Sequence, residues 1–320
     1  MPVLLLAIEP SHLPEGVEAQ LRAAAPEYEL LVLRDREAIE ARVDEIEIII
    51  GFPPRELLAA MPRLRWYQQW AAGADWLRRH PELVEADFVL TSAVGIHAVQ
   101  IGEHVFACLL ALARELPAAV EAQHERRWRD FEAASPFELY EKELLVVGVG
   151  AIGSRVAVLG QAFGMRVSGV RRNPERAAAG VDRMVGPDAL DEVLAEADAV
   201  VVTVPLTDET RGLFDAERIA RMKPGAVLVN IGRGGTVDEL ALAAALGDGR
   251  LRGAALDVFE TEPLPNGSPL WTAPNLLVTG HYAGATPRYG ERAMALALDN
   301  LARYRQGRPL ANVVDKRLGY

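Results

Sequence analysis

Three charged residues in the second half of the chain have side chains that could perform acid–base and carboxylate chemistry. They are Arg233, Glu262 and His281, and each stands shortly after an apolar run that predicts a buried strand. An imidazole titrates near neutral pH and can move a proton, and a neighbouring carboxylate can hold its tautomer. A guanidinium can bind a carboxylate through two parallel hydrogen bonds and polarise a carbonyl group. We therefore expect these three residues to form a catalytic group.

Each of the three residues also has a simpler structural interpretation. Arg233 stands between glycines and could be a surface charge, and Glu262 precedes a proline and could be a turn residue. Five other histidines compete with His281: His12, His80, His97, His104 and His124. Among them His97 competes most strongly, because it lies where the chain is expected to cross between domains. Only His281 follows a strand of the second half, where open α/β sheets bind ligands beyond the carboxyl ends of strands.

A glycine-rich turn with the pattern G-x-G-x-x-G follows a buried strand and precedes a helical pattern. In this setting Gly148 permits the tight turn, Gly150 lets the backbone approach a pyrophosphate, and Gly153 allows the helix to pack closely on the strand. The helix N-terminus adds unpaired N–H groups and a positive dipole end. The residues expected to line the phosphates are Gly148, Gly150, Ala151, Ile152 and Gly153. The alternative is a plain glycine turn.

The residues after the next strand indicate which dinucleotide the turn would bind. NAD sites place an acid about twenty residues beyond the glycines, where it accepts from the ribose 2′-hydroxyl. Here the strand Arg166–Val170 ends in Arg171 and Arg172, with no acid at its tip. An arginine can bind a 2′-phosphate in bidentate geometry, which a carboxylate would repel. This favours NADP over NAD, and a solvated basic turn is the alternative.

Strand and helix patterns alternate in both halves of the chain. The expected strands of the first half are Val3–Ile8, Tyr28–Leu33, Ile46–Ile50, Arg65–Gln69 and Phe88–Thr91. Those of the second half are Leu144–Val149, Arg166–Val170, Ala199–Val204, Ala226–Ile231, Gly253–Val258 and Leu276–Thr279. Apolar strands separated by helices imply parallel sheets covered on both faces. The fold class is therefore α/β, with two doubly wound parallel-sheet domains, one Rossmann dinucleotide-binding domain and one flavodoxin-like substrate domain.

At 320 residues the chain is longer than a single core usually supports, so two domains are expected. We assign residues 99–287 to the dinucleotide-binding domain. Residues 1–98 and 288–320 form the discontinuous substrate domain, because the amphipathic tail helix, about Arg288–Gln306, must bury its apolar face. A long helix from about Ala98 to Leu116, which Pro117 should end, begins the second domain.

Composition limits the partners of the protein. A net charge of −11 argues against general nucleic-acid binding, which needs a surplus of Lys and Arg. The single cysteine, Cys108, lies in an apolar run and is expected to be a buried thiol. The N-terminus has no basic region typical of a signal peptide, and no apolar run is long enough to cross a bilayer. We expect a cytoplasmic protein with no membrane partner and no metal site.

Three segments in order, Asn230–Gly235, Leu256–Pro265 and Thr279–Gly284, resemble the D-isomer-specific 2-hydroxyacid dehydrogenase family. Together with the glycine turn and the closing segment Arg308–Asp315, the resemblance spans nearly the whole chain. It is strongest to NADP-preferring members, which include glyoxylate/hydroxypyruvate reductases. One departure is Gly280, which stands where the family usually has a proline. The Glu–His pair also differs from formate dehydrogenases, whose relatives use an amide partner.

The resemblance implies hydride transfer between NADPH and a small 2-oxo acid, giving a D-2-hydroxy acid, with Arg233, Glu262 and His281 as the catalytic residues. It implies that Asp257 bonds the nicotinamide carboxamide, although a strand-end acid can instead cap a local turn. The other implied contacts are Thr203, Pro205 and Ile231 beside the nicotinamide, and Ala72 and Gly73 with backbone N–H groups toward the substrate. It also implies a homodimer through the long helix. The alternatives are an NAD-linked dehydrogenase and a catalytically silent nucleotide-sensing regulator.

Overall fold

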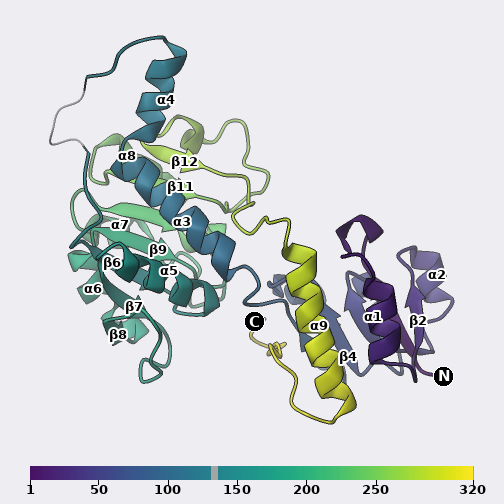
Figure 1. The fold of residues 1–320 in the computed structure, drawn as a ribbon. Coiled ribbons are helices and arrows are strands. Elements are labelled where there is room, and N and C mark those ends of the chain that lie inside the picture. Colours follow the sequence, from purple (N-terminus) through teal and green to yellow (C-terminus); the bar gives the residue numbers. More distant parts are fainter. Residues whose placement is uncertain (131–135, 320) are drawn as a thin grey trace. The chain divides into compact units, whose positions relative to one another are not determined.

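The computed structural model describes residues 1–130 and 136–319 of the chain. Residues 131–135 and 320, which fall within the expected domains, lie outside the described residues. The chain divides into two compact units, Met1–Ile96 with Thr286–Tyr320 and His97–Ala285 (Figure 1). Each unit has its own parallel β-sheet and its own hydrophobic core.

The first unit is a five-stranded parallel sheet with the order β2-β1-β3-β4-β5. Its strands are β1 (Val3–Ala7), β2 (Glu29–Val32), β3 (Ile46–Gly51), β4 (Trp66–Gln69) and β5 (Val89–Thr91). This is the flavodoxin-like order, in which the strand order reverses between β1 and β3 while all strands stay parallel. The expected flavodoxin-like sheet is therefore present.

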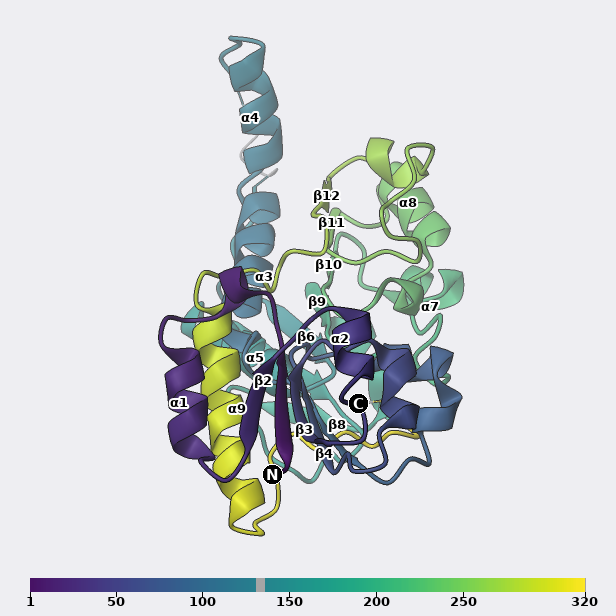
Figure 2. The ribbon, with the colours of Figure 1, turned by 90° about the vertical axis from the view of Figure 1, so that its right-hand side faces the viewer.

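Helices cover both faces of this sheet because its strands are apolar on both sides. Leu4 and Leu6 of β1 pack with α1 (Val17–Ala24) and α9 (Tyr289–Arg305), which lie side by side in Figures 1 and 2. Leu5, on the opposite face, packs in a cluster with Ile39 of α2 (Arg36–Glu40). The tail helix thus completes the core of the first unit.

The second unit is a seven-stranded parallel sheet with the order β12-β11-β10-β9-β6-β7-β8. Its strands are β6 (Glu143–Val147), β7 (Arg166–Val170), β8 (Arg183–Val185), β9 (Ala199–Val202), β10 (Val227–Asn230), β11 (Gly253–Leu256) and β12 (Leu276–Val278). Strand order reverses between β6 and β9, and doubly wound sheets bind ligands beside such a reversal.

Two layers of helices cover the second sheet. Leu144 and Val146 of β6 belong to the core cluster that contains α3 (Ala98–Ala113) and α5 (Ala151–Ala162). Leu145 and Val147 point into the other cluster, with α6 (Leu190–Glu196), α7 (Ala216–Arg221) and α8 (Glu239–Gly247). This arrangement is the Rossmann architecture expected from the alternating pattern.

The prediction that Pro117 ends the long helix was wrong. Helix α3 ends at Ala113, and a second helix, α4 (Leu116–His124), carries Pro117 in its first turn. A proline is tolerated there because its missing N–H would have no partner in that turn. Helix α4 extends beyond the end of α3 and away from the sheet (Figure 2). Among the described residues, no helix is both long and apolar enough to cross a membrane.

Candidate functional site

The glycine turn lies between β6 and α5, beside the reversal of strand order. Gly148 has a φ of 101°, and a Cβ there would lie 2.8 Å from Val204 Cγ1. A Cβ on Gly153 would lie 2.4 Å from the Gly148 carbonyl oxygen, so helix and turn are in backbone contact. Gly150 is the N-cap of α5, and a Cβ there would meet no atom within 4 Å. The open space at Gly150, next to the N–H groups of a helix start, fits a pyrophosphate.

Strand β7 ends at Val170, and the two arginines follow it directly. Arg171 Nη1 donates to the carbonyl oxygen of Arg176 at 3.1 Å, which fixes one edge of its guanidinium. The pKa of Glu209 is lowered, first by a hydrogen bond from the Thr207 hydroxyl and also by the charge of Arg172. The tip of β7 is therefore cationic and borders the loop after β9.

The segment after β9 fastens the glycine turn. Thr203 Oγ1 donates to the Gly148 carbonyl oxygen at 2.5 Å. The Pro205 carbonyl oxygen accepts from Thr210 Oγ1 at 2.6 Å. Ile231, directly after β10, is 7% exposed and packs in the same core cluster as Val149. Of these expected nicotinamide contacts, Thr203 therefore also holds the glycine turn by a hydrogen bond, and Ile231 also packs in the core of the Rossmann unit.

Arg233 is held by a network of hydrogen bonds after β10. Asn230, fully buried at the end of the strand, donates from Nδ2 to the Arg233 carbonyl oxygen and accepts from the Gly232 N–H, both at 3.0 Å. Thr236 Oγ1 donates to the same Arg233 carbonyl oxygen at 2.6 Å. A Cβ on Gly234 would lie 1.8 Å from the carbonyl carbon of Phe259. The arginine loop therefore presses directly against the loop after β11.

Glu262 and His281 come together in the second unit. Glu262 Oε2 lies 2.7 Å from His281 Nδ1, and Glu262 Oε1 accepts from the Phe259 N–H at 3.0 Å. The side chains are 37% and 50% exposed, so ligands and solvent can reach them. Because the carboxylate occupies Nδ1, the opposite ring nitrogen, Nε2, is the atom available for proton transfer. This geometry suits general acid–base chemistry.

Asp257 is buried at the end of β11, with 3% of its surface exposed. Its Oδ1 accepts from Thr279 Oγ1 at 2.6 Å and from the Tyr282 N–H at 3.1 Å. Its Oδ2 accepts from the Ala283 N–H at 3.0 Å. The carboxylate therefore anchors the loop that carries His281, which is the local capping role that the sequence left open for it.

In the first unit, the loop after β4 carries Ala72 and Gly73. The buried Gln69 donates from Nε2 to the carbonyl oxygens of Ala71 and Gly73, at 2.8 and 2.9 Å. Its Oε1 accepts from Trp76 Nε1 at 2.8 Å. In a planar trans peptide the N–H points opposite to the carbonyl, so the N–H of Ala72 points away from Gln69. Such an oriented backbone could bind an anion.

The family model described as "D-isomer specific 2-hydroxyacid dehydrogenase, NAD binding domain" matches residues 106–283. The chain belongs to the D-isomer specific 2-hydroxyacid dehydrogenase family. This confirms the resemblance stated from the sequence and the expectation of an NAD(P)-dependent oxidoreductase that acts on a small molecule.

One relative in sequence and two solved structures match this dehydrogenase over nearly its full length. A glyoxylate reductase from Aeropyrum pernix is 35% identical over 314 residues, which cover 94% of this chain and 90% of the relative. A D-isomer specific 2-hydroxyacid dehydrogenase from Xanthobacter autotrophicus Py2, in complex with NADPH and MES, has a TM-score of 0.85 and is 34% identical in sequence. The match covers 100% of this chain and 99% of that protein. An NADPH-dependent glyoxylate/hydroxypyruvate reductase from Sinorhizobium meliloti, in complex with NADP and sulfate, has a TM-score of 0.83 and 31% identity, with the same coverage. The predicted fold class is confirmed.

Other histidines of the dehydrogenase have partners of a different kind. His80 Nδ1 lies 3.2 Å from Glu82 in the first unit, and His97 and His104 contact the loop 279–284 from α3. His104 Nε2 is also 3.6 Å from Cys108 Sγ. Burial, together with the charge of Asp257, raises the pKa of the Cys108 thiol to about 11, so the expected buried thiol stays protonated.

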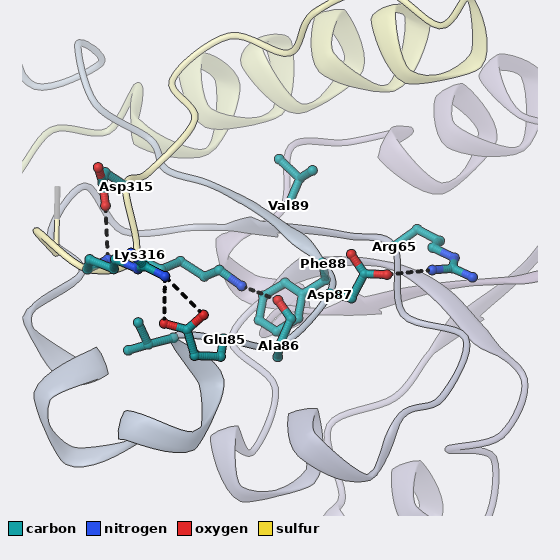
Figure 3. A pocket seen from close by; sticks show the side chains of 10 residues that line it. Arg65, Glu85, Ala86, Asp87, Phe88, Val89, Asp315 and Lys316 are labelled. Carbon is teal, nitrogen blue, oxygen red and sulfur yellow. Dashed lines mark hydrogen bonds and ion pairs between the residues drawn. The ribbon is translucent and has the colours of Figure 1, made fainter.

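A separate hollow of about 640 Å³ lies in the first unit of the dehydrogenase (Figure 3). Its charged side chains pair with one another: Arg65 with Asp87 at 3.3 Å, and Arg317 with Glu85 at 3.1 Å. Lys316 lies over the ring of Phe88, 4.4 Å from its centroid. We assign no ligand to this hollow. Residues 1–130 and 136–319 also contain no group of three or more His, Cys, Asp or Glu that could hold a metal ion.

The glycine turn allows a matched pair of substitutions. Gly153→Ala is expected to lower the free energy of unfolding by about 1–3 kcal/mol, because the new Cβ would overlap the Gly148 carbonyl oxygen and push α5 off the sheet. Gly150→Ala should unfold at the wild-type denaturant concentration, since its Cβ meets open space, but should bind NADPH more weakly. Urea unfolding and NADPH titration of both variants measure this. A Gly153→Ala protein as stable as the wild type would contradict the close contact.

Proposed function

We propose that this dehydrogenase reduces a small 2-oxo acid to the D-2-hydroxy acid with NADPH, as a glyoxylate/hydroxypyruvate reductase does. The observation that carries the proposal is the 2.7 Å contact between Glu262 Oε2 and His281 Nδ1, in a Rossmann unit with an open glycine turn. Family membership supports the reaction class. The glyoxylate reductase name of one relative supports the substrate class.

Each catalytic residue has one task in this mechanism. The nicotinamide, when bound, supplies the hydride that reaches the C2 carbon of the substrate. Arg233 binds the substrate carboxylate and polarises the C2 carbonyl. His281 gives the proton on Nε2 to the carbonyl oxygen as C2 becomes tetrahedral. Glu262 keeps the Nδ1–H of His281 in place and stabilises the imidazolium before that transfer; in the reverse direction the neutral ring accepts the proton.

The cofactor would be held by residues of the second unit. Those proposed for the pyrophosphate are Gly148, Gly150, Ala151, Ile152 and Gly153, and those for the nicotinamide half are Thr203, Pro205, Ile231 and Asp257. Arg171 and Arg172 would bind the 2′-phosphate, because two cations and no acid follow β7. The complexes of two similar proteins with NADPH or NADP support this preference. NAD is the alternative cofactor for the same reaction.

The substrate would also contact the first unit through backbone N–H groups of Ala72 and Gly73. Support comes from Gln69, which holds the carbonyls of this loop and so orients the Ala72 N–H away from the core. A short 2-oxo acid such as glyoxylate or hydroxypyruvate carries the carboxylate that these groups would bind.

The predicted homodimer and cytoplasmic location stay predictions. Exposed apolar residues on and beside α4 support a self-association surface next to the long helix: Leu116, Val120 and Trp128 are 51%, 52% and 89% exposed. Sedimentation should give twice the chain mass of 34.8 kDa, and a monomer would refute the dimer. Cell fractionation tests the location.

A panel of 2-oxo acids, followed at 340 nm with NADPH and NADH, tests the reaction. Wild-type protein should oxidise NADPH with glyoxylate or hydroxypyruvate and have a higher kcat/KM with NADPH than with NADH. His281→Ala should lower kcat on the order of a hundredfold or more and leave the Kd for NADPH nearly unchanged, because it removes the proton donor. His80→Ala is the matched control, since it removes a histidine with a carboxylate partner elsewhere.

Binding of NADPH with no oxidation of it by any 2-oxo acid would overturn the reductase and favour the nucleotide-sensing regulator. A higher kcat/KM with NADH would favour the NAD-linked alternative.

Adjacent glutamines on β4 give a matched pair for the substrate loop. Gln69→Met removes the donor to Ala71 and Gly73 and should raise KM for the 2-oxo acid on the order of tenfold, because the loop N–H groups lose their orientation. Gln68→Met removes bonds to Thr91 and Asn300 instead, so it should lose stability without the rise in KM. Steady-state kinetics and melting curves of both variants are compared. An equal rise in KM for both would show that the loss is only structural.

A further inference from the structure

We propose that polar side chains on one face of α3 position the loop that carries His281. These side chains are Gln100 and His104, with His97 at the N-cap of the helix, and their spacing of three and four residues places them on one face. The loop runs from Thr279 to Gly284. The inference rests on the proposed function, because the loop matters as the carrier of the proposed proton donor.

A chain of hydrogen bonds runs from His104 of α3 through Thr279 to Asp257. The Thr279 hydroxyl donates its single proton to Asp257 Oδ1 at 2.6 Å. His104 Nε2 lies 3.2 Å from the same hydroxyl oxygen, so it must be the donor in that contact and carry the proton. An imidazole, a hydroxyl and a carboxylate therefore form one directed chain of hydrogen bonds across three elements.

The chain of hydrogen bonds holds the loop on both sides of His281. Thr279 lies before it, and its carbonyl oxygen accepts from the His281 N–H at 3.1 Å. Tyr282 and Ala283 lie after it and donate their N–H groups to Asp257. His281 itself has a φ of 56°, a left-handed conformation that few residues with a side chain adopt. Surrounding bonds must maintain such a conformation.

Two more contacts reach the far end of the loop. Gln100, which is only 8% exposed, donates from Nε2 to the Gly284 carbonyl oxygen at 3.1 Å. His97 Nδ1 lies 3.3 Å from the same oxygen. The His104 ring also meets the ring of Tyr282 edge to face, with centroids 5.9 Å apart. Helix α3 thus touches the loop at its beginning, middle and end.

These contacts make Thr279 and His104 positioning residues. The side chains of Thr279 and His104 form no hydrogen bond with Glu262 or with the His281 ring. They therefore act on the proton donor only by fixing the backbone around it. A displacement of about 1 Å in a reacting group can lower turnover on the order of a hundredfold. Loss of the chain of hydrogen bonds should therefore appear in kcat rather than in cofactor affinity.

The test compares Thr279→Val with Thr279→Ser, which differ in the hydroxyl that the network needs. Valine keeps the shape without the hydroxyl and should lower kcat on the order of tenfold or more, with the Kd for NADPH within about twofold of wild type. Serine should retain turnover near the wild-type value. Amide hydrogen exchange of the segment 279–285, followed by mass spectrometry, should be faster than wild type in the valine variant and unchanged in the serine variant. Gln100→Met removes the hydrogen bond from α3 to Gly284, at the other end of the loop, and should also speed exchange. It provides a second variant if Thr279→Val does not fold.

Each outcome decides the inference. Three results would overturn it. Hydrogen exchange could be unchanged in both Thr279→Val and Gln100→Met. Exchange could be faster in Thr279→Val while kcat stays at the wild-type value, or Thr279→Ser could be as slow in turnover as Thr279→Val. A wild-type protein that reduces no 2-oxo acid would overturn the proposed function instead, and hydrogen exchange would still show whether α3 holds the loop.

Discussion

The hydrogen bond between Glu262 and His281 is the interaction on which the proposed chemistry depends. Its two partners follow β11 and β12, which pair in parallel register from Ala254 with Leu276 to Leu256 with Val278. Parallel neighbours present their carboxyl ends at one edge of the sheet, so loops after them can join residues that are 19 positions apart. The register of two short strands therefore brings a carboxylate and an imidazole together, and the loops need only turn them toward each other.

Glycines then set how closely those loops approach. A Cβ on Gly234 would overlap the backbone of Phe259, so any other residue would separate the Arg233 loop from the loop that leads to Glu262. Gly153 plays the same part between α5 and the glycine turn, where a Cβ would lie 2.4 Å from a carbonyl oxygen. In both places backbone touches backbone, and side-chain volume alone would disrupt the arrangement.

Helices and strands that leave a regular pattern of apolar residues could be predicted from the sequence, and individual hydrogen bonds between side chains and remote backbone could not. The apolar run Ala199–Val202 forms β9 within the predicted bounds Ala199–Val204, because a buried strand leaves a continuous apolar signal. The half-exposed edge strand β8, Arg183–Val185, leaves no such signal and was not predicted. Pro117 was misjudged because a proline ends one helix or starts another with the same residue. Hydrogen bonds such as that from Gln100 to the Gly284 carbonyl oxygen join a side chain to backbone 184 positions away in the sequence, and no periodicity predicts them.

Histidines in this protein show that partners, rather than residue type, decide what a side chain does. His281 is half exposed and faces a carboxylate, so its free nitrogen can exchange a proton with a ligand. His104 lies on an apolar helix, between a hydroxyl and a thiol, and its Nε2 proton is committed to Thr279. The hydroxyl in turn donates to the buried carboxylate of Asp257, which also accepts the N–H groups on the far side of His281. His104 thus acts through Thr279 and Asp257 on the backbone that carries His281. His281 keeps one ring nitrogen for proton transfer.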